Sequence, residues 1–415
     1  MSGARLYLFD DARARRWAPF SLTRPVGELL FGCSTLRARI EHVLGIECDG
    51  HVSRRALLGF DEQDAPAGLS LDQVARDRPI VFLSSRAVPD FQPVDLPDEA
   101  ARITVGGTPA GWVIPPDAEL PSELWIRDPG HDAGTAPELA LGGILLERPW
   151  DLVAQNSDRI RSDATTMSGH GGFLPGVVGG SNGTPASGVV VVGNGTVLLG
   201  NGTEIEAGVT LDTRRGPIVL DHDVRVEGPA RLAGPLFVGS GTLVAGGAIS
   251  TSSIGPNCRV RGEISDSVLV AYVNKAHEGY LGHALVGRWV NLGALTTNSD
   301  LKNNYSTVTV WTPDGDIDTE QIKIGCYLGD HVKTGIGTLL NTGTVVGAGS
   351  NIFGGAMPPV AVPPFSWGAG SDLTEYRLDK FLETAERVMA RRDVTLTAGM
   401  RKVLEAAWSA TAGRR

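Results

Sequence analysis

The chain has 415 residues, a formal net charge of −10 and a sequence pI near 5.3. This acidic balance argues against nucleic acid as a partner, because binding a phosphate backbone needs a basic face, whereas a small phosphorylated ligand needs only a few cations or backbone amides. No apolar run reaches the length of about 18 residues that crosses a membrane, and the four scattered cysteines indicate free thiols in a reducing compartment, so we expect a cytoplasmic protein.

Residues 1–168 come first and have the mixed pattern of an α/β domain. Leu6–Phe9 predicts a short buried strand that ends in Asp10 and Asp11, and residues 79–83 predict a second strand. Asp10 and Asp11 are candidate metal or ribose ligands.

The rest of this half alternates between helix and loop signals. Residues 26–44 carry apolar side chains at helical spacing, and residues 149–160 predict another helix. Residues 109–137 are rich in Pro, Gly and Asp, which predicts a loop. A glycine-rich linker over 169–188 marks the domain boundary that we expect.

Residues 189–368 are dominated by a period of six. Small or aliphatic residues recur at this spacing at Ile218, Val224, Ala230, Leu236, Thr242, Ala248, Ile254 and Val260, and again at Leu328, Thr334, Leu340, Val346 and Ile352. A six-residue period predicts a parallel β-helix in which each hexapeptide makes one short strand and one turn. The repeat is expected to stop at Gly354, after which the proline-rich run leaves as an extended arm and residues 369–415 form a helical tail that covers an open coil end.

Residues 271–321 break the six-residue rhythm and are rich in polar side chains. We interpret them as a binding loop inserted into a rigid coil. The alternative is a polar surface excursion without a ligand.

Three motifs in and around this loop resemble the acetyltransferase half of the bacterial GlmU family, which makes UDP-N-acetylglucosamine. They are His277-Glu-Gly-Tyr280-Leu-Gly282, Val290-Asn291-Leu-Gly293-Ala294 and Asn298-Ser299-Asp300. Nearly the whole chain is also similar to a GlmU-like group of sugar nucleotidyltransferases, through residues 9–11, 23–32, 273–277, 291–305, 341–347 and 363–368.

This resemblance implies a fold and an assembly. The fold is a nucleotidyltransferase-like α/β domain over 1–168, a left-handed parallel β-helix of hexapeptide repeats over 189–368 and a C-terminal helix over 369–415. The assembly implied is a homotrimer with sites between neighbouring coils.

The resemblance also implies acetyl transfer from acetyl-CoA to the amine of a hexosamine 1-phosphate. His277 would be the general base, because a group with a pKa near neutrality suits removal of a proton from an attacking amine, and His283 is its nearest competitor. The other implied roles are sugar-phosphate binding by Lys275, Tyr280, Asn291, Lys302 and Asn304, and acetyl-CoA binding by Gly293, Asn298, Thr338 and Asn341.

The N-terminal domain is implied to transfer a nucleotidyl group from an NTP, with UTP the first choice, to a sugar 1-phosphate. The implied nucleotide contacts are Asp11, Thr23, Arg24 and Glu28, and the implied Mg²⁺ ligands are Asp151 and Asp158. The chain departs from ordinary members, since it lacks their glycine-rich L-A-A-G-x-G-T-R loop and has Ser84-Ser85-Arg86 where they offer a metal-binding Asp. Two alternatives therefore stay open: an enzyme with one active half, and a non-catalytic regulator that binds sugar nucleotides.

Overall fold

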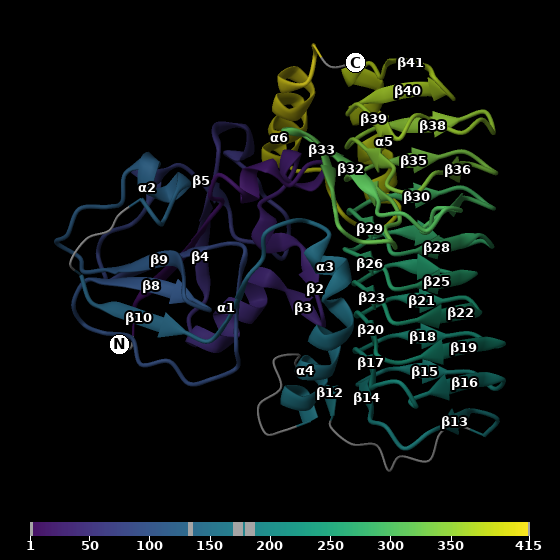
Figure 1. Ribbon diagram of the computed structural model, residues 1–415, viewed down its shortest axis with the longest axis horizontal. Helices are drawn as coiled ribbons and strands as arrows, with labels where there is room; N and C mark the ends of the chain where they lie inside the picture. Colours follow the sequence, from purple (N-terminus) through teal and green to yellow (C-terminus); the bar gives the residue numbers. More distant parts are fainter. Residues whose placement is uncertain (1–2, 132–135, 169–176, 179–186, 414–415) are drawn as a thin grey trace. The chain divides into compact units, whose positions relative to one another are not determined.

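A computed structural model of the chain describes residues 3–131, 136–168, 177–178 and 187–413 (Figure 1). These residues form two compact units. The first comprises Met1–Leu29, Thr35–Pro149 and Val394–Ala410, and the second comprises Leu30–Ser34, Trp150–Asp393 and Thr411–Arg415. The division differs from the expected boundary at residue 168, because residues 150–168 group with the coil, and most of the expected linker lies outside the described residues.

The first unit is built on a mixed sheet. Within the described residues its strand order is β10 (Glu138–Leu141), β8 (Ala101–Val105), β9 (Thr108–Ile114), β6 (Ile80–Ser84), β1 (Arg5–Phe9), β4 (Cys48–Val52) and β5 (Gly68–Leu69). β1 runs parallel to β4 and β6, while β9 is antiparallel to β6 and β8. Apolar side chains pack on both faces of this sheet, so the predicted strands at residues 6–9 and 79–83 are confirmed as β1 and β6.

Two predictions for the N-terminal part of the chain are partly wrong. The expected helix over 26–44 is confined to α1 (Leu36–Leu44), because Gly32 turns the chain at a φ of 68° between β2 (Leu30–Phe31) and β3 (Ser34–Thr35). The expected loop over 109–137 contains strand β9 and helix α2 (Glu123–Arg127). β9 forms because its apolar residues pair with β6 and pack in the core.

The remaining short elements of the first unit complete this layer. They are β7 (Ala87–Pro89) paired with β11 (Gly143–Leu145), and the 3-10 turns Ala14–Arg16, Phe20–Leu22, Val26–Glu28, Arg55–Leu57 and Leu71–Gln73. Helix α6 (Ala398–Ala410) also belongs to this unit, where the Sδ atom of Met400 accepts a hydrogen bond from the amide of Asp61.

The second unit is a parallel β-helix whose strands stack in three faces (Figure 1). The first face contains, in order, β12 (Val177–Val178), β14 (Val197–Gly200), β17 (Ile218–Leu220), β20 (Leu236–Val238), β23 (Ser253–Ile254), β26 (Val268–Leu269), β29 (Leu285–Val286), β34 (Tyr327–Leu328), β37 (Val345–Val346) and β39 (Ala361–Val362). The second face contains β15 (Glu204–Ile205), β18 (Arg225–Val226), β21 (Leu243–Val244), β24 (Arg259–Val260), β27 (Asn274–Lys275), β30 (Asn291–Leu292), β35 (Lys333–Thr334), β38 (Asn351–Phe353), β40 (Ser366–Ala369) and β41 (Asp372–Glu375).

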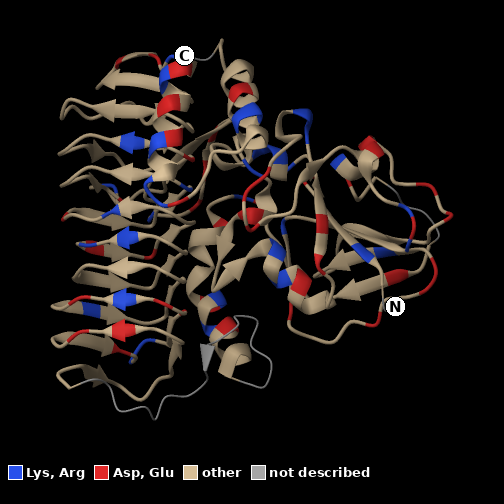
Figure 2. Ribbon diagram, turned by 180° about the vertical axis from the view of Figure 1, so that it is seen from behind, with Lys and Arg blue, Asp and Glu red and all other residues tan. Residues whose placement is uncertain are grey.

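The third face is shorter than the other two. It contains β13 (Val190–Val192), β16 (Val209–Asp212), β19 (Ala230–Ala233), β22 (Gly247–Ser250), β25 (Glu263–Ser265) and β28 (Tyr280–Gly282). Most aliphatic residues of the six-residue rows stack inside the coil as one continuous core, while basic and acidic residues are interspersed along its strands (Figure 2). The predicted β-helix is therefore confirmed, and its form is compatible with the left-handed coil that we expected.

Two boundaries of the coil were predicted wrongly. The chain does not leave the coil at residue 271, because β27, β28 and β30 continue its faces, and β31 (Thr297–Asn298) pairs with β36 (Leu339–Leu340) in a separate two-stranded sheet. The excursion begins only at Ser299, carries the hairpin β32 (Thr309–Thr312) and β33 (Gly315–Asp318), and returns near Lys323. The boundary was predicted too early in the sequence because many outward-facing residues here are polar. The inward-facing residues Val273, Val290 and Leu292 remain apolar and pack in the core of the coil.

The second wrong boundary is the stop at Gly354. The proline-rich run contributes β39 and β40, which pair with β37 and β38. Its prolines lie between or beside these short strands, where they interrupt no ladder bond, so no extended arm forms.

Helices cover parts of this unit. α3 (Asp151–Ala154) and α4 (Asn156–Ser168) precede the coil, and α5 (Leu378–Ala390) follows it, which confirms the helical tail. The α5 residue Phe381 packs edge-on against Phe365 and His331 at ring-centroid distances of 5.0 and 5.8 Å. In the described part of the chain, none of the helices is both long enough and apolar enough to cross a bilayer.

Candidate functional site

A turn between β27 and β28 presents His277 to solvent. Beneath it lies Lys275, only 2% exposed, whose Nζ donates hydrogen bonds to the carbonyl oxygens of Arg261 at 2.8 Å and His277 at 2.7 Å. Burial lowers the pKa of Lys275 to about 8, although the nearby Glu278 carboxylate acts in the opposite direction. The lysine therefore fixes the backbone of the turn while the imidazole of His277 stays accessible.

The opposite end of β28 holds a second polar cluster around Asp300. One oxygen of this carboxylate, Oδ2, accepts hydrogen bonds from the Tyr280 hydroxyl at 2.8 Å and from His283 Nδ1 at 2.7 Å. Burial would raise the pKa of Asp300, but the hydrogen bonds from His283 and Tyr280 outweigh it and hold the pKa below its ordinary value. Burial, reinforced by Asp300, raises the pKa of Tyr280.

Asp300 reaches this place because the excursion leaves and re-enters the coil there. The amide of Ile324 donates to the Asp300 carbonyl at 3.0 Å, and Leu301 forms a β-bridge with Lys323. The outgoing and returning strands of the excursion thus meet at His283, and their pairing fixes the carboxylate against the imidazole.

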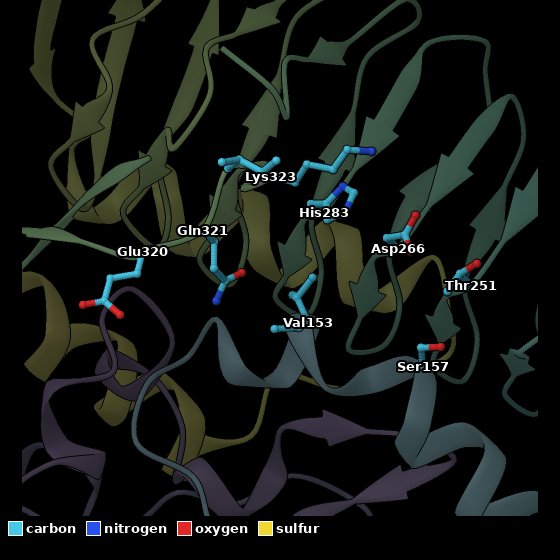
Figure 3. A pocket seen from close by; sticks show the side chains of 10 residues that line it. Val153, Ser157, Thr251, Asp266, His283, Glu320, Gln321 and Lys323 are labelled. Carbon is cyan, nitrogen blue, oxygen red and sulfur yellow. The ribbon is translucent and has the colours of Figure 1, made fainter. Parts of the chain in front are cut away.

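His283 also lines a cavity of about 440 Å³, which we name the corner pocket. Figure 3 shows its walls: Thr251, Asp266 and His283 come from successive coils, and Val153 and Ser157 come from the helical segment α3–α4. Ala154, Glu320, Gln321, Ile322 and Lys323 complete the lining. Asp300 belongs to one sequence motif and His283 directly follows another, but nothing in their spacing indicated this pocket.

Two residues assigned to acetyl-CoA have their polar groups engaged in the coil. The Asn298 side chain is 2% exposed, and it pairs with both peptide groups of Gly282: its Oδ1 accepts from the amide at 2.9 Å, and its Nδ2 donates to the carbonyl at 2.9 Å. The amide of Gly293 donates to the carbonyl and the hydroxyl of Thr334. Asn298 thereby completes the edge of the third face, which ends at β28.

The remaining acetyltransferase candidates are spread over the coil and the excursion. Asn291 accepts a hydrogen bond from the Asn274 side chain at 2.8 Å on the second face. Lys302 donates to the Thr307 carbonyl, and Asn304 accepts from the Ser306 amide, both within the excursion. The Thr338 hydroxyl donates to the Gly335 carbonyl, and the exposed Asn341 accepts from the Thr342 amide.

Exposed apolar side chains lie near the His277 turn. Leu295, Ile336 and Leu339 are 58%, 74% and 46% exposed. The Leu295 amide donates to the carbonyl of Glu278, the neighbour of His277, so this leucine occupies the same corner one coil further along. Large apolar side chains left in water at one place indicate a surface that a ligand or another chain covers.

In the first unit, the predicted nucleotide residue Asp11 lies just beyond the carboxyl end of β1, and its partners Ser84 and Arg86 lie at or just beyond the carboxyl end of β6. β4 and β6 flank β1 on opposite sides, and such a change of direction is where open α/β sheets bind ligands. The Asp11 carboxylate is buried there, and it accepts hydrogen bonds from Arg86 Nη2 at 2.6 Å, from the Ser84 hydroxyl at 3.0 Å and from the Ala14 amide at 2.9 Å. Its acceptor positions are therefore occupied by the protein itself.

The other nucleotide candidates are also buried, and two of them are ion-paired. Arg24 forms two hydrogen bonds with Glu62 at 3.0 and 3.1 Å, and the hydroxyl-bearing Thr23 beside it is 1% exposed. Glu28 accepts from His51 Nε2 at 2.7 Å and from Arg37 Nε at 2.6 Å. Although burial alone would raise it, these partners lower the pKa of Glu28 to about 2.

The two aspartates expected to bind Mg²⁺ lie on the helices α3 and α4. Asp151 lies in the first turn of α3, and Asp158 lies on α4 with a side chain 92% exposed, 3.4 Å from Arg161. The described residues contain no cluster of three or more His, Cys, Asp or Glu side chains that could hold a metal ion.

Comparisons with known proteins relate the chain to transferases. Residues 6–170 match the sequence profile of the family described as sugar nucleotidyl transferase, which confirms the resemblance found from the N-terminal motifs. Over 95 residues, the chain is 30% identical to a bifunctional sugar-1-phosphate nucleotidylyltransferase/acetyltransferase of Sulfurisphaera tokodaii, a match that covers 23% of this chain and 24% of the relative.

Two further proteins are similar to parts of the chain. The chain is 24% identical over 155 residues to the uncharacterised acetyltransferase YaiX of Escherichia coli, covering 34% of this chain and 64% of the relative. A solved Bacillus cereus structure described as an acetyltransferase is 13% identical, with a TM-score of 0.24, and the match covers 55% of this chain and 98% of that one. The chain thus matches about a quarter of the length of the Sulfurisphaera tokodaii relative and less than two thirds of the length of YaiX.

Proposed function

We propose that this protein is a transferase that acts on sugar phosphates. The match of residues 6–170 to sugar nucleotidyl transferases supports this proposal. In this proposal its coil transfers an acetyl group from acetyl-CoA to the amine of a hexosamine 1-phosphate. The names of the relatives support an acetyltransferase, and the exposed His277 on its fixed turn is the observation that carries the assignment of the base.

The proposed chemistry needs one proton acceptor. The amine nitrogen forms a bond to the thioester carbonyl carbon, the carbon–sulfur bond breaks, and the proton lost by nitrogen passes to His277 and then to the departing thiolate. A neutral imidazole suits this role near pH 7. His277 is exposed, while the hydrogen bond from Lys275 to its carbonyl fixes the backbone that carries it.

Thiol release from acetyl-CoA in the presence of glucosamine 1-phosphate tests this assignment. His277→Ala is expected to reduce turnover by at least about a hundredfold, as general-base removal does, with an unchanged circular dichroism spectrum. His222→Ala is the matched control, because His222 is another exposed histidine of the coil. Near-normal turnover by the His277 variant would remove the proposed base.

We further propose that Leu295, Ile336 and Leu339 pack against a second copy of the chain in a homotrimer. Their exposure supports this, since an apolar patch of this kind favours association. Light scattering should give three times the chain mass, and Ile336→Glu should lower it; a monomeric wild-type protein would contradict the assembly.

A second candidate is a protein in which only the coil is catalytic. It is favoured by the first unit, where Asp11, Arg24 and Glu28 are buried in ion pairs with other side chains. Incubation with Mg²⁺, UTP and sugar 1-phosphates distinguishes the two cases. Pyrophosphate release identifies a nucleotidyltransferase with two active halves, and silence with all four NTPs identifies the coil-only enzyme.

A further inference from the structure

The corner pocket is built by the second unit alone and does not include His277. Helix α4 is anchored beside it, because the Asn156 Oδ1 accepts a hydrogen bond at 3.0 Å from the hydroxyl of Ser253, a coil residue two positions from the corner. Its volume of about 440 Å³ lies in the range of roughly 300–1,000 Å³ that is common for small-molecule sites.

The tautomer of His283 follows from its partner. The pKa of Asp300 is lowered, so its carboxylate is ionised near neutral pH and can only accept hydrogen bonds. His283 Nδ1 must therefore carry the proton in the 2.7 Å hydrogen bond. In the neutral ring, Nε2 is then an acceptor with a fixed orientation, and within the described part of the chain it has no protein partner.

Two of the other lining side chains, Asp266 and Glu320, can only accept hydrogen bonds when ionised, whereas Ser157, Thr251 and Gln321 can both donate and accept. Within the described residues, the carboxylates of Asp266 and Glu320 also have no hydrogen-bond donor or cationic partner. Lys323 supplies the single ammonium group among the lining residues. A ligand that pairs with His283 Nε2 and these two carboxylates brings donors to them, which hydroxyl and ammonium groups supply.

We propose that the corner pocket is a second small-molecule site that binds an amino sugar, with His283 Nε2 and the Asp266 carboxylate accepting hydrogen bonds from its ammonium and hydroxyl groups. This site is separate from the acetyl-transfer site proposed at His277, since the two histidines lie at opposite ends of β28. The proposal therefore stands whether or not His277 is the base.

Free D-glucosamine is the probe, and the ring signals of His283 in long-range proton–nitrogen spectra of the full chain are the readout. Saturable movement of the His283 signals is expected, with D-glucose about tenfold weaker or more, because a charge-assisted hydrogen bond to the ammonium is lost. Saturation without movement at His283, no saturation, or equal binding of glucose would overturn the proposal.

Two variants locate the site. Asp266→Asn and His283→Asn suit the backbone, since both positions have a φ of 47° and Asn tolerates left-handed geometry. Calorimetry should find glucosamine binding weakened about tenfold or more by either variant. Asp223→Asn is the matched control, because this exposed corner aspartate has a φ of 55° and does not line the pocket.

His277→Gln separates the two sites. Its glucosamine affinity should remain within about twofold of wild type if the amino sugar binds in the corner pocket. Loss of binding in this variant, together with unchanged binding in Asp266→Asn, would place the amino sugar at the His277 turn and overturn the second site.

Discussion

Asn298 offers a sharp test of how the third face of the coil ends. Its side-chain amide pairs with both peptide groups of Gly282, and Nδ2 also donates to the Ser299 carbonyl at 3.1 Å. Asn298→Ala leaves the buried amide and carbonyl of Gly282 without these partners. Each unpaired buried group costs roughly 1–3 kcal/mol, so the pair costs about 2–6 kcal/mol locally.

Hydrogen exchange measured by mass spectrometry on peptides that cover residues 280–286 reports this local loss. Because about 1.4 kcal/mol corresponds to tenfold, a cost of about 2 kcal/mol or more speeds exchange by about 30-fold or more. Asn298→Asp should be at least as damaging, since its carboxylate would face the Gly282 carbonyl. Asn304→Ala is the control, because this exposed residue pairs only within the excursion. Unchanged exchange in a folded Asn298→Ala protein would refute the reasoning.

Two further predictions concern the first unit. Arg86→Met leaves the Asp11 carboxylate buried without its guanidinium partner, so the free energy of unfolding should fall by about 3–5 kcal/mol. The control is Arg78→Ala, which removes a surface ion pair with an N–O distance of 3.6 Å and should cost at most about 1 kcal/mol. Equal shifts of the melting temperature in the two variants would contradict this prediction. The folded protein lowers the pKa of Glu28 from its ordinary value of 4.5 to about 2, so the stabilisation by Glu28 is complete above pH 4.5 and is lost as the pH falls toward 2. Acid-unfolding curves of Glu28→Gln should lack this component, and curves identical to those of the wild type would contradict the prediction.

The coil was predictable from sequence because its core rows depend only on spacing. The six-residue rows can be recognised from the local sequence alone. The boundaries of the coil depend on pairing with strands far away in the sequence, such as β31 with β36. Outward polar residues such as Asn274 and Asn291 were mistaken for a loop, since a solenoid strand needs only its inward side chain to be apolar. Proline was likewise a misleading stop signal, because the strands here are two to four residues long and prolines fit between them.

The candidate site was predictable only in part. The His277 turn was predictable because it belongs to a local motif. The residue that fixes its backbone, Lys275, lies only two positions away in the sequence. The pairing of His283 with Asp300 was not predictable, because it depends on the closure of the excursion at the Leu301–Lys323 bridge. In the first unit the sequence located the acidic strand end, but the buried partner of Asp11 comes from a segment 75 residues away.

The two units exchange chain segments, and this limits how the halves can be separated. Leu30–Ser34 groups with the coil, where the Gly32 amide donates to Asn156, and Val394–Ala410 groups with the α/β unit. A fragment that ends at Pro149 would lack helix α6, which belongs to the first unit. A fragment that starts at Trp150 would lack Leu30–Ser34, which belongs to the second unit. Each unit consists of three separate segments of the chain. A recombination event that exchanged one unit with that of a related gene would have to transfer all three segments, so the two units are poorly suited to exchange as independent modules.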